Sequence, residues 1–232
     1  MSLKLCVLFT GGKDSMFAFH ISKLVGHEIE CISAVKPKSP DSMLYHSPGI
    51  EHLKIYEKAI GLPLFLYEGT GNEELDFEEM LKSIKLEYNI DGVATGAIDS
   101  DYQFIRFQLI LRRLGLKMFA PLWHKDQEEY MRRLPKYGFK YIITKISALG
   151  IPHSLLGKEI DDKATENIIN LSKKYGFNPA FEGGEAETMV LDAPLMRCKI
   201  DVKGNIIKSS EFEWYYSIYD INCLEKRQST ME

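Results

Sequence analysis

Apolar and polar positions along the first half of the chain follow two different periods. Short apolar runs typical of β-strands occupy residues 3–9, 28–35, 63–67, 92–95 and 117–120. Segments with the apolar spacing of helices lie between these runs, over residues 13–25, 49–60, 73–88 and 102–114. Strands that alternate with helices favour a parallel sheet covered on both faces. We therefore expect an α/β fold with a parallel five-stranded sheet that binds its ligand at the carboxyl ends of the strands.

The pattern changes after Pro121. Helical spacing returns over residues 126–136 and 161–175, and a strand is predicted over 140–146. Residues 180–188 are expected to form an acidic loop, and residues 196–210 a hairpin that turns at Lys203 and Gly204. We predict a larger domain over residues 1–121, a smaller α+β domain over 122–225 and a frayed tail over 226–232.

The composition narrows the class of protein. With 45% hydrophobic and 27% charged residues among 232, the chain is typical of a soluble globular protein. A net charge of −4 gives no general attraction to a phosphate backbone, so we expect no direct binding to nucleic acid. No apolar run approaches the roughly 20 residues that span a bilayer, and the N-terminus lacks signal-peptide features, so we expect a cytoplasmic protein without a membrane anchor. The four cysteines show neither metal-ligand nor redox spacing, and we interpret them as small buried thiols.

The first chemical motif is Thr-Gly-Gly-Lys-Asp-Ser at residues 10–15, between the first predicted strand and the first predicted helix. Two glycines let the backbone turn sharply and bring N–H groups close to a ligand. The helix N-terminus adds partial positive charge, Lys13 adds a full charge, and Thr10 and Ser15 add hydroxyl donors. These groups suit a pyrophosphate, although the spacing fits neither the Walker nor the dinucleotide-binding pattern. A plain strand-to-helix turn with a solvated lysine is the alternative.

A second motif, Thr-Gly-Ala-Ile-Asp-Ser-Asp-Tyr-Gln, follows the fourth predicted strand at residues 95–103. Gly96 frees the backbone, Ser100 or Asp101 can cap the next helix, and Arg106 lies one turn into that helix. Backbone donors and an arginine could meet the α-phosphate of a nucleotide at this place. A capped loop with a surface arginine explains the same residues equally well.

The third motif, Phe-Glu-Gly-Gly-Glu-Ala-Glu-Thr at residues 181–188, places three carboxylates around two adjacent glycines. The segment Leu-Asp-Ala-Pro-Leu follows at 191–195. Carboxylates at this density suit a cationic ligand, such as ammonium, a quaternary amine or a magnesium ion. A solvated acidic turn is the alternative.

The first motif resembles the Ser-Gly-Gly-Lys-Asp-Ser signature of the PP-loop ATP pyrophosphatases, with Thr10 in place of the first serine. Together the three motifs resemble the diphthine–ammonia ligase family, which pairs a Gly-Ala…Ser-Asp-Tyr-Gln segment with a Glu-Gly-Gly-Glu…Glu-Thr…Leu-Asp…Pro segment. Residues 43–46, 121–123, 148–150 and 156–158 also fall in family order, so the resemblance covers about residues 3–215. The chain departs from the family at Phe104, where a basic residue is usual, and at Gln108, where an acidic one is frequent. It also lacks the C-terminal extension of many eukaryotic members.

The resemblance implies a HUP-type, Rossmann-like sheet that binds ATP and cleaves it between the α- and β-phosphates. Lys13, Asp14, Arg106 and Glu185 are implied to be catalytic, with Asp14 also in the coordination sphere of Mg²⁺. ATP contacts are implied at Thr10, Gly11, Gly12, Lys13, Asp14, Ser15, Ala34, Val35, Gly96, Ala97, Ser100 and Gln103. Substrate contacts are implied at Tyr45, His46, Tyr102, Glu182, Gly183, Gly184, Glu185, Glu187 and Thr188.

The reaction that the family implies is the last step of diphthamide formation. The carboxylate of diphthine attacks the α-phosphate of ATP, and ammonia then displaces AMP from the acyl-adenylate. The expected partners are translation elongation factor 2 carrying diphthine, and ammonium, and the sequence is compatible with a homo-oligomer. Two alternatives remain: a transfer-RNA-modifying PP-loop enzyme, which the acidic charge and the lack of a thiolase cysteine set disfavour, and a non-catalytic ATP or AMP sensor, which the acidic motif disfavours.

Overall fold

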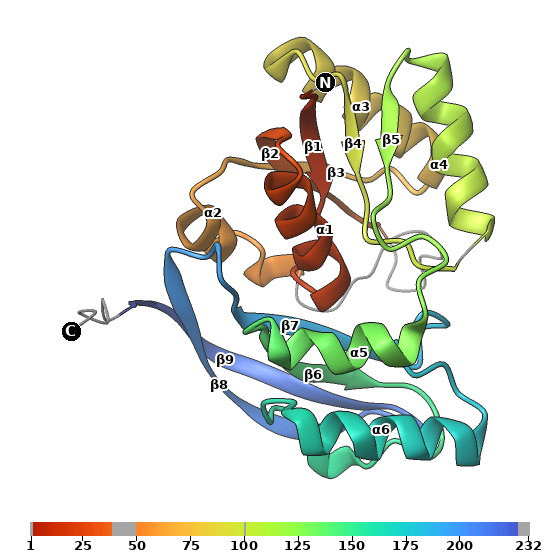
Figure 1. Ribbon diagram of the computed structural model, residues 1–232, viewed down its shortest axis with the longest axis vertical. Helices are drawn as coiled ribbons and strands as arrows, with labels where there is room; N and C mark the ends of the chain where they lie inside the picture. The colour runs from red at the N-terminus through yellow and green to blue at the C-terminus, as the bar shows by residue number, and fades with distance from the viewer. Residues whose placement is uncertain (1, 39–49, 100, 227–232) are drawn as a thin grey trace.

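The computed structural model describes residues 2–38, 50–99 and 101–226 (Figure 1). Its larger sheet has the strand order β3-β2-β1-β4-β5, and every neighbouring pair is parallel. These strands are β1 (Lys4–Leu8), β2 (Glu28–Lys36), β3 (Leu64–Glu68), β4 (Gly92–Ala94) and β5 (Lys117–Phe119). The predicted α/β fold with a five-stranded parallel sheet is therefore confirmed. Successive strands are added on one side of β1 up to β3 and on its other side from β4 onward, and open parallel sheets bind ligands at such a switch point.

Helices lie on both faces of this sheet (Figure 1). Successive residues of β1 point to opposite faces, so Leu5 and Val7 join one buried cluster and Cys6 joins another. The first cluster includes side chains of α1 (Lys13–Leu24) and α2 (Ile55–Ile60). The second includes side chains of α3 (Glu73–Tyr88) and α4 (Asp101–Arg113). The strands are thus buried on both sides, as their nearly continuous apolar runs predict.

The C-terminal part contains an antiparallel sheet in the order β7-β6-β9-β8, with α5 (Gln127–Lys136) and α6 (Asp162–Tyr175) packed along it (Figure 1). Its strands are β6 (Lys140–Ile146), β7 (Ala186–Asp192), β8 (Cys198–Lys208) and β9 (Trp214–Glu225). Two short 3₁₀ helices are η1 (Ile50–His52) and η2 (His153–Leu155). In the part of the chain that the structure describes, none of the helices has the length and apolar character that crossing a bilayer requires.

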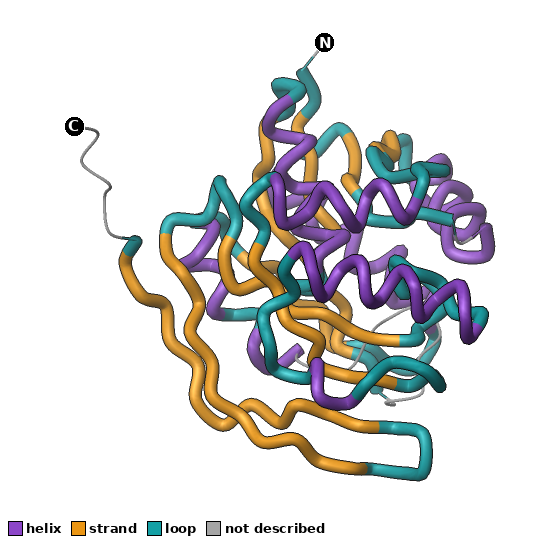
Figure 2. The backbone as a smooth tube through the Cα atoms, turned by 60° about the horizontal axis from the view of Figure 1, so that its bottom comes forward, coloured by secondary structure: helices purple, strands orange, loops and turns teal. Residues whose placement is uncertain are grey.

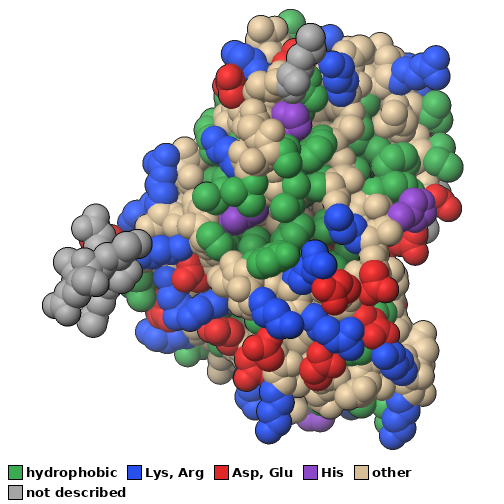
Figure 3. Space-filling model, in the orientation of Figure 1, with side chains coloured by type: hydrophobic (Ala, Val, Ile, Leu, Met, Phe, Trp, Pro, Cys, Tyr) green, Lys and Arg blue, Asp and Glu red, His purple; other side chains and the backbone are tan. Residues whose placement is uncertain are grey.

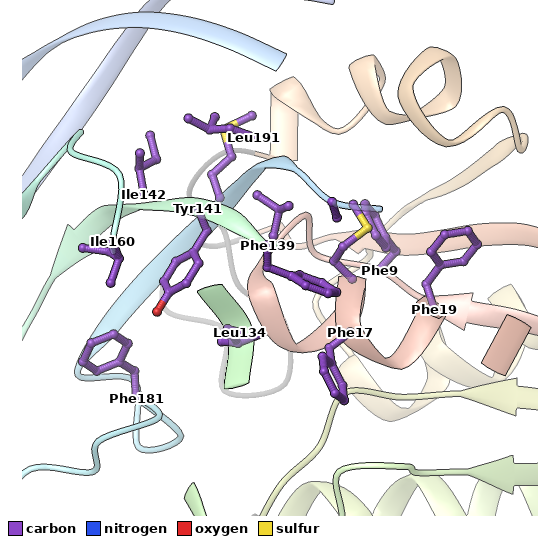
Figure 4. Close-up of a cluster of buried hydrophobic side chains, with 14 of the residues drawn as sticks. Phe9, Phe17, Phe19, Leu134, Phe139, Tyr141, Ile142, Ile160, Phe181 and Leu191 are labelled. Carbon is purple, nitrogen blue, oxygen red and sulfur yellow. The ribbon is translucent and has the colours of Figure 1, made fainter. Parts of the chain in front are cut away.

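One hydrophobic core joins the two sheets (Figure 4). Phe9 and Phe17, from the start of the chain, belong to the same buried cluster as Leu134, Phe139 and Tyr141 from the C-terminal part. The carboxyl edge of the parallel sheet therefore abuts the antiparallel sheet. A ligand at that edge would lie between the two parts.

The structure differs from the sequence predictions in the C-terminal sheet. β8 continues through Lys203 and Gly204, where its register with β9 shifts, because a glycine inside a strand often marks a bulge rather than a turn. The turn lies at residues 209–213, where the Ser209 N–H donates to the Glu213 carbonyl oxygen. The sequence pattern did not predict β9 (Figure 2). Two further differences are that residues 186–188 of the predicted acidic loop belong to β7, and that η1 and α2 replace one helix over 49–60.

The cysteines also differ from expectation. Cys198 on β8 and Cys223 on β9 form a disulfide with their Cα atoms 5.7 Å apart. The prediction of four free thiols is therefore wrong for this pair, because β9 brings Cys223 next to β8. Cys6 and Cys31 are buried thiols at paired positions of β1 and β2.

Positively and negatively charged side chains are interspersed over α5 and α6 on the face seen in Figure 3. Arg132 pairs with Glu166 at 2.7 Å, and Lys173 pairs with Glu128 at 2.9 Å. Blue and red side chains alternate there, so this face presents no continuous basic surface to a phosphate backbone.

His20 makes the stability of the fold depend on pH. Its side chain is 3% exposed, with Nδ1 2.8 Å from the Met16 carbonyl oxygen and Nε2 accepting from the Leu195 N–H at 3.0 Å. Burial lowers the pKa of His20 from 6.5 to about 4. The unfolded chain therefore binds this proton more readily, and the stability that the neutral ring contributes is complete above pH 6.5 and lost as pH falls toward 4.

We expect this one ring to remove about 3 kcal/mol of unfolding free energy across that window. Urea unfolding of the protein and of His20→Gln, measured at several pH values, separates this effect from the titration of carboxylates. The His20→Gln protein should lose distinctly less stability on acidification. Equal losses in both proteins would contradict the assignment.

Candidate active site

The nucleotide loop, residues 10–15, joins β1 to α1 at the carboxyl edge of the parallel sheet. Gly11 has a left-handed φ of 75°, and a Cβ there would lie 2.9 Å from the Tyr56 ring. A Cβ on Gly12 would lie 3.2 Å from the Thr188 carbonyl oxygen. Both glycines therefore let neighbouring segments approach the loop backbone closely.

Hydroxyl groups close the loop on itself. The Thr10 and Ser15 hydroxyl oxygens lie 3.2 Å apart, and the Ser15 hydroxyl also donates to the Gly12 carbonyl oxygen at 3.1 Å. The Thr10 N–H donates to the Ser15 hydroxyl oxygen at 3.2 Å. These bonds fix the shape of the loop, which reduces the ordering that binding requires.

The edge of β7 holds the loop from the C-terminal side. The Val190 N–H donates to the Gly11 carbonyl oxygen at 2.9 Å, and the Tyr56 hydroxyl lies 2.7 Å from the Val190 carbonyl oxygen. The Lys13 N–H donates to the Thr188 hydroxyl at 3.1 Å. The third motif thus reaches the first through its final residue, Thr188.

Lys13 and Asp14 form a mostly buried ion pair at the start of α1. The Lys13 Nζ lies 2.8 and 3.0 Å from the two Asp14 carboxylate oxygens, donates to the Ala180 carbonyl oxygen at 2.6 Å, and lies 5.5 Å from the centre of the Phe181 ring. Asp14 also accepts a hydrogen bond from the Tyr130 hydroxyl at 2.8 Å. Burial, and then the charge of Asp14, raises the pKa of Tyr130 well above its ordinary value, so Tyr130 remains a donor.

The second motif packs directly on the first. A Cβ on Gly96 would lie 2.6 Å from the Asp14 carbonyl carbon, so a larger residue cannot make this contact. The N–H groups of Ile98 and Asp99 both donate to one carboxylate oxygen of Glu182, at 2.9 and 3.2 Å. Burial, and then the Asp14 charge, raises the pKa of Glu182, whereas these two hydrogen bonds oppose the rise. Glu182 therefore links the second motif to the third.

Glu185 shapes the acidic loop. Its two carboxylate oxygens accept the N–H groups of Asn178 at 2.8 Å and Gly183 at 2.9 Å. Phe181 and Gly184 have left-handed φ angles of 64° and 81°, and such strain in a non-glycine residue is typical of functional sites. The catalytic role of Glu185 stays a prediction, because the structure engages both of its oxygens within the loop.

Glu187 lies on β7 opposite Lys145 of β6. Burial raises the pKa of Glu187 to about 7, while the Lys145 charge opposes the rise and Glu213 adds to it. The Lys145 Nζ lies 3.4 Å from a Glu213 carboxylate oxygen. Glu187 can therefore exchange a proton near neutral pH.

Arg106 lies on the helix that follows the second motif. It is on α4 and forms an ion pair with Glu74 of α3, with Nη1 and Oε1 2.5 Å apart. Its predicted contact is with the α-phosphate of a nucleotide. That role stays a prediction.

Three of the other predicted residues are described by the structure, and the side chains of five are not. Ala34 and Val35 lie near the end of β2, which pairs with β1. The Val35 side chain belongs to the buried cluster that includes α3, so the strand backbone is what an adenine could contact. Ala97 is buried within the second motif. The remaining predicted positions lie outside the described residues or have side chains that the structure does not describe: Tyr45, His46, Ser100, Tyr102 and Gln103.

Sequence reasoning missed three residues of the site. Tyr56 and Tyr130 place their hydroxyls on the loop and on Asp14, and Ala180 offers its carbonyl oxygen to Lys13. Both tyrosines fall at apolar positions of helical patterns, where a core residue looks the same. No short motif contains them, so only the three-dimensional arrangement identifies them.

Asp14 is the carboxylate of the nucleotide loop that could hold a magnesium ion. Within the described ranges, no group of three or more His, Cys, Asp or Glu side chains is placed to hold a metal ion. Mg²⁺ bound to nucleotide phosphates needs only one or two protein carboxylates. Asp14 fits that requirement if the Lys13 ammonium moves from it toward the phosphates.

Comparisons with known proteins match both parts of the chain. The family model described as Diphthamide synthase N-terminal domain matches residues 3–118, and Diphthamide synthase C-terminal domain matches residues 126–227. The human protein named Diphthine--ammonia ligase is 34% identical over 90% of this chain and 84% of its own length. The protein of that name from Danio rerio is 34% identical over 88% of this chain and 89% of its own length. The one from Saccharomyces cerevisiae is 30% identical over 91% of this chain but only 36% of its own length.

A solved structure gives a weaker likeness. The crystal structure of a predicted subunit of tRNA methyltransferase from Methanocaldococcus jannaschii covers 82% of this chain at 16% identity, with a TM-score of 0.44, which supports no conclusion about this chain. The family matches instead agree with the three motifs, which meet around Lys13 and Asp14. The chain belongs to the diphthamide synthase family.

Proposed function

We propose that this chain is an AMP-forming diphthine–ammonia ligase, which amidates the carboxylate of diphthine on translation elongation factor 2. The observation that carries the proposal is the meeting of three loops at one point. Gly96 packs on Asp14, Glu182 binds the 95–99 loop, and Lys13 binds the Ala180 carbonyl oxygen. A site built from an anion-binding loop and an acidic loop suits a reaction that joins ATP to a carboxylate carrying a quaternary ammonium group.

The reaction has two steps. In the first, a carboxylate oxygen of diphthine attacks the α-phosphorus of ATP, the bond to the bridging oxygen of the β-phosphate breaks, and pyrophosphate leaves. In the second, ammonia attacks the acyl carbon, AMP leaves with the former carboxylate oxygen, and the nitrogen loses a proton. Activation is needed because a carboxylate is a poor electrophile in water.

The nucleotide loop would stabilise the charge that grows on the departing pyrophosphate. Its backbone N–H groups lie at the N-terminus of α1, and the Lys13 ammonium is buried beside them. Fixed donors in a water-poor site make the largest contributions to such steps. Asp14 would hold a Mg²⁺ ion on the phosphates, and the ion would supply neutralising charge there. Arg106 would help to stabilise the α-phosphate.

The carboxylates near the loop would serve the cationic reactants. Glu182 holds the two loops together, and Glu187 has a pKa of about 7 that suits removal of a proton from the attacking nitrogen. Elongation factor 2 would present its modified side chain to this narrow site, so the encounter would be transient. We also propose that the protein acts in the cytoplasm. The proposed reaction is compatible with a homo-oligomer.

The proposal is tested by incubating the protein with ATP, magnesium, ammonium and elongation factor 2 that carries diphthine. AMP release should accompany the mass change from carboxylate to carboxamide on the factor, and omission of ammonium should prevent the mass change. Tight ATP binding with neither product would favour a nucleotide sensor. AMP release that depends on transfer RNA instead of the factor would favour an RNA-modifying enzyme.

A further inference from the structure

A cavity of 510 Å³ opens between the nucleotide loop and the β8–β9 hairpin. Thr10 and Gly11 line one side of it, and Glu51 and His52 of η1 line a second side. Tyr215 and its neighbours on β9 line the side opposite the loop. Thr188, the last residue of the third motif, also lines the cavity, whereas Lys13, Asp14 and Glu182 are not among its described lining residues. The residue roles proposed above therefore assign no reactant to this cavity.

The sheet register places a charged row at the border of the cavity. Lys145 of β6 pairs with Glu187 of β7 on one side and with Tyr215 of β9 on the other, and Tyr215 pairs with Ile207 of β8. Directly paired residues point to the same face of a sheet. Tyr215 and Ile207 line the cavity, so Glu187 and Lys145 continue the same face from its border.

The charges of this wall favour a cation over an anion. Among the described lining residues there is no lysine or arginine, and Glu51 supplies a carboxylate. At the border, Lys145 stands between Glu187 and Glu213, so two carboxylates surround one ammonium group. The lining therefore offers a carboxylate and no described lysine or arginine, which favours a cation over a phosphate at this end.

The Tyr215 ring, which lines the cavity, already has one cation beside it. The Lys145 Nζ lies 5.5 Å from the centre of the Tyr215 ring, and the Tyr215 hydroxyl donates to the Glu213 carboxylate at 3.3 Å. A ring held next to carboxylates is the usual means of binding quaternary ammonium groups, which cannot donate hydrogen bonds. The rest of the lining combines apolar side chains with hydroxyls, such as Met189 and Ser217, which also suits methyl groups around a charge.

We propose that this cavity receives the quaternary ammonium group of the substrate, with the Tyr215 ring as its aromatic wall and the Glu51 carboxylate as its counter-charge. Thr10 and Gly11 border the same cavity, so a substrate carboxylate on the same side chain would face the nucleotide loop. This inference rests on the proposed ligase activity for the identity of the substrate. The residues that line the cavity support by themselves a quaternary ammonium group as the class of ligand.

The test compares choline with its neutral isostere dimethylbutanol, in which carbon replaces the nitrogen. Saturation-transfer NMR on the protein alone should show binding of choline and not of dimethylbutanol. Tyr215→Leu should abolish the choline signal, and Tyr215→Phe should keep it because the ring face remains. Tyr219→Leu is the matched control, because Tyr219 lies on the same strand, is 67% exposed and does not line the cavity.

In the ligase assay, Tyr215→Leu should raise the KM for the modified factor about tenfold and leave kcat and the KM for ATP unchanged. Equal binding of choline and dimethylbutanol, or an unchanged KM in Tyr215→Leu, overturns the inference while the ligase activity stands. Choline binding that depends on Tyr215, in a protein that forms no AMP, supports the cation pocket and refutes the proposed reaction.

Discussion

Replacing Lys13 with alanine is expected to lower kcat/KM for AMP formation about a thousandfold, which corresponds to about 4 kcal/mol of transition-state stabilisation. The Lys13 side chain is 2% exposed and supplies a full positive charge at the N-terminus of α1. A charge in such a water-poor place acts on departing pyrophosphate with little screening. Initial rates of AMP release at varied ATP and factor concentrations measure the loss.

The same substitution removes structural contacts, so the loss must be separated from unfolding. Without Lys13 the Ala180 carbonyl oxygen loses its donor, and we expect a loss of about 1–3 kcal/mol in unfolding free energy. Lys163→Ala is the control, because Lys163 is an exposed lysine on α6 and should leave both quantities unchanged. Activity within tenfold of the parent, in a Lys13→Ala protein shown to be folded, would remove Lys13 from the chemistry.

The parallel sheet could be predicted from sequence because its signals are local. Each strand is a short apolar run, and each connecting helix has its own apolar spacing, so no distant partner is needed to recognise either. In the structure the first helix after β3 has a side-chain cap at its start, where the Asn72 side chain accepts from the Leu75 N–H of α3. The resulting order of strands and helices restricts the topology strongly.

The C-terminal sheet depends on pairing between distant residues, which sequence periodicity does not contain. β9 inserts between β6 and β8, and its aromatic residues face both the core and the cavity. The glycine at Gly204 looks like a turn in one dimension and is a bulge in the sheet. The Cys198–Cys223 disulfide could not be predicted for the same reason, since it exists only where β8 and β9 pair.

The candidate site also divides into residues that local motifs predict and contacts that only the fold creates. Residues with local chemical signatures, such as Gly11, Lys13 and Glu182, lie together around the nucleotide loop. The sequence did not indicate that Glu182 would bind the N–H groups of the 95–99 loop, or that Tyr130 would hold Asp14. These contacts join segments about a hundred residues apart or show no motif, so the fold alone creates them.

Replacing Gly96 with alanine should have the second largest effect, because this glycine fits two loops together. The added Cβ would lie 2.6 Å from the Asp14 carbonyl carbon and 2.7 Å from the Ser15 nitrogen. These are backbone atoms of the first turn of α1, so they cannot rotate away as a side chain would. We expect the 95–99 loop to separate from the nucleotide loop and the affinity for ATP to fall about a hundredfold, with about 1–3 kcal/mol of lost stability from overpacking.

Gly176→Ala provides a control of similar cost to stability. Gly176 ends α6 with a φ of 78° and has nothing within 4 Å of an added Cβ, so alanine there costs about 1–2 kcal/mol in backbone strain alone. Calorimetric titration with ATP should therefore show normal affinity in Gly176→Ala and weak affinity in Gly96→Ala, although both proteins are destabilised. Normal ATP affinity in Gly96→Ala would mean that the contact between Gly96 and Asp14 does not form the nucleotide site, and the 95–99 loop would then have to act elsewhere in the reaction.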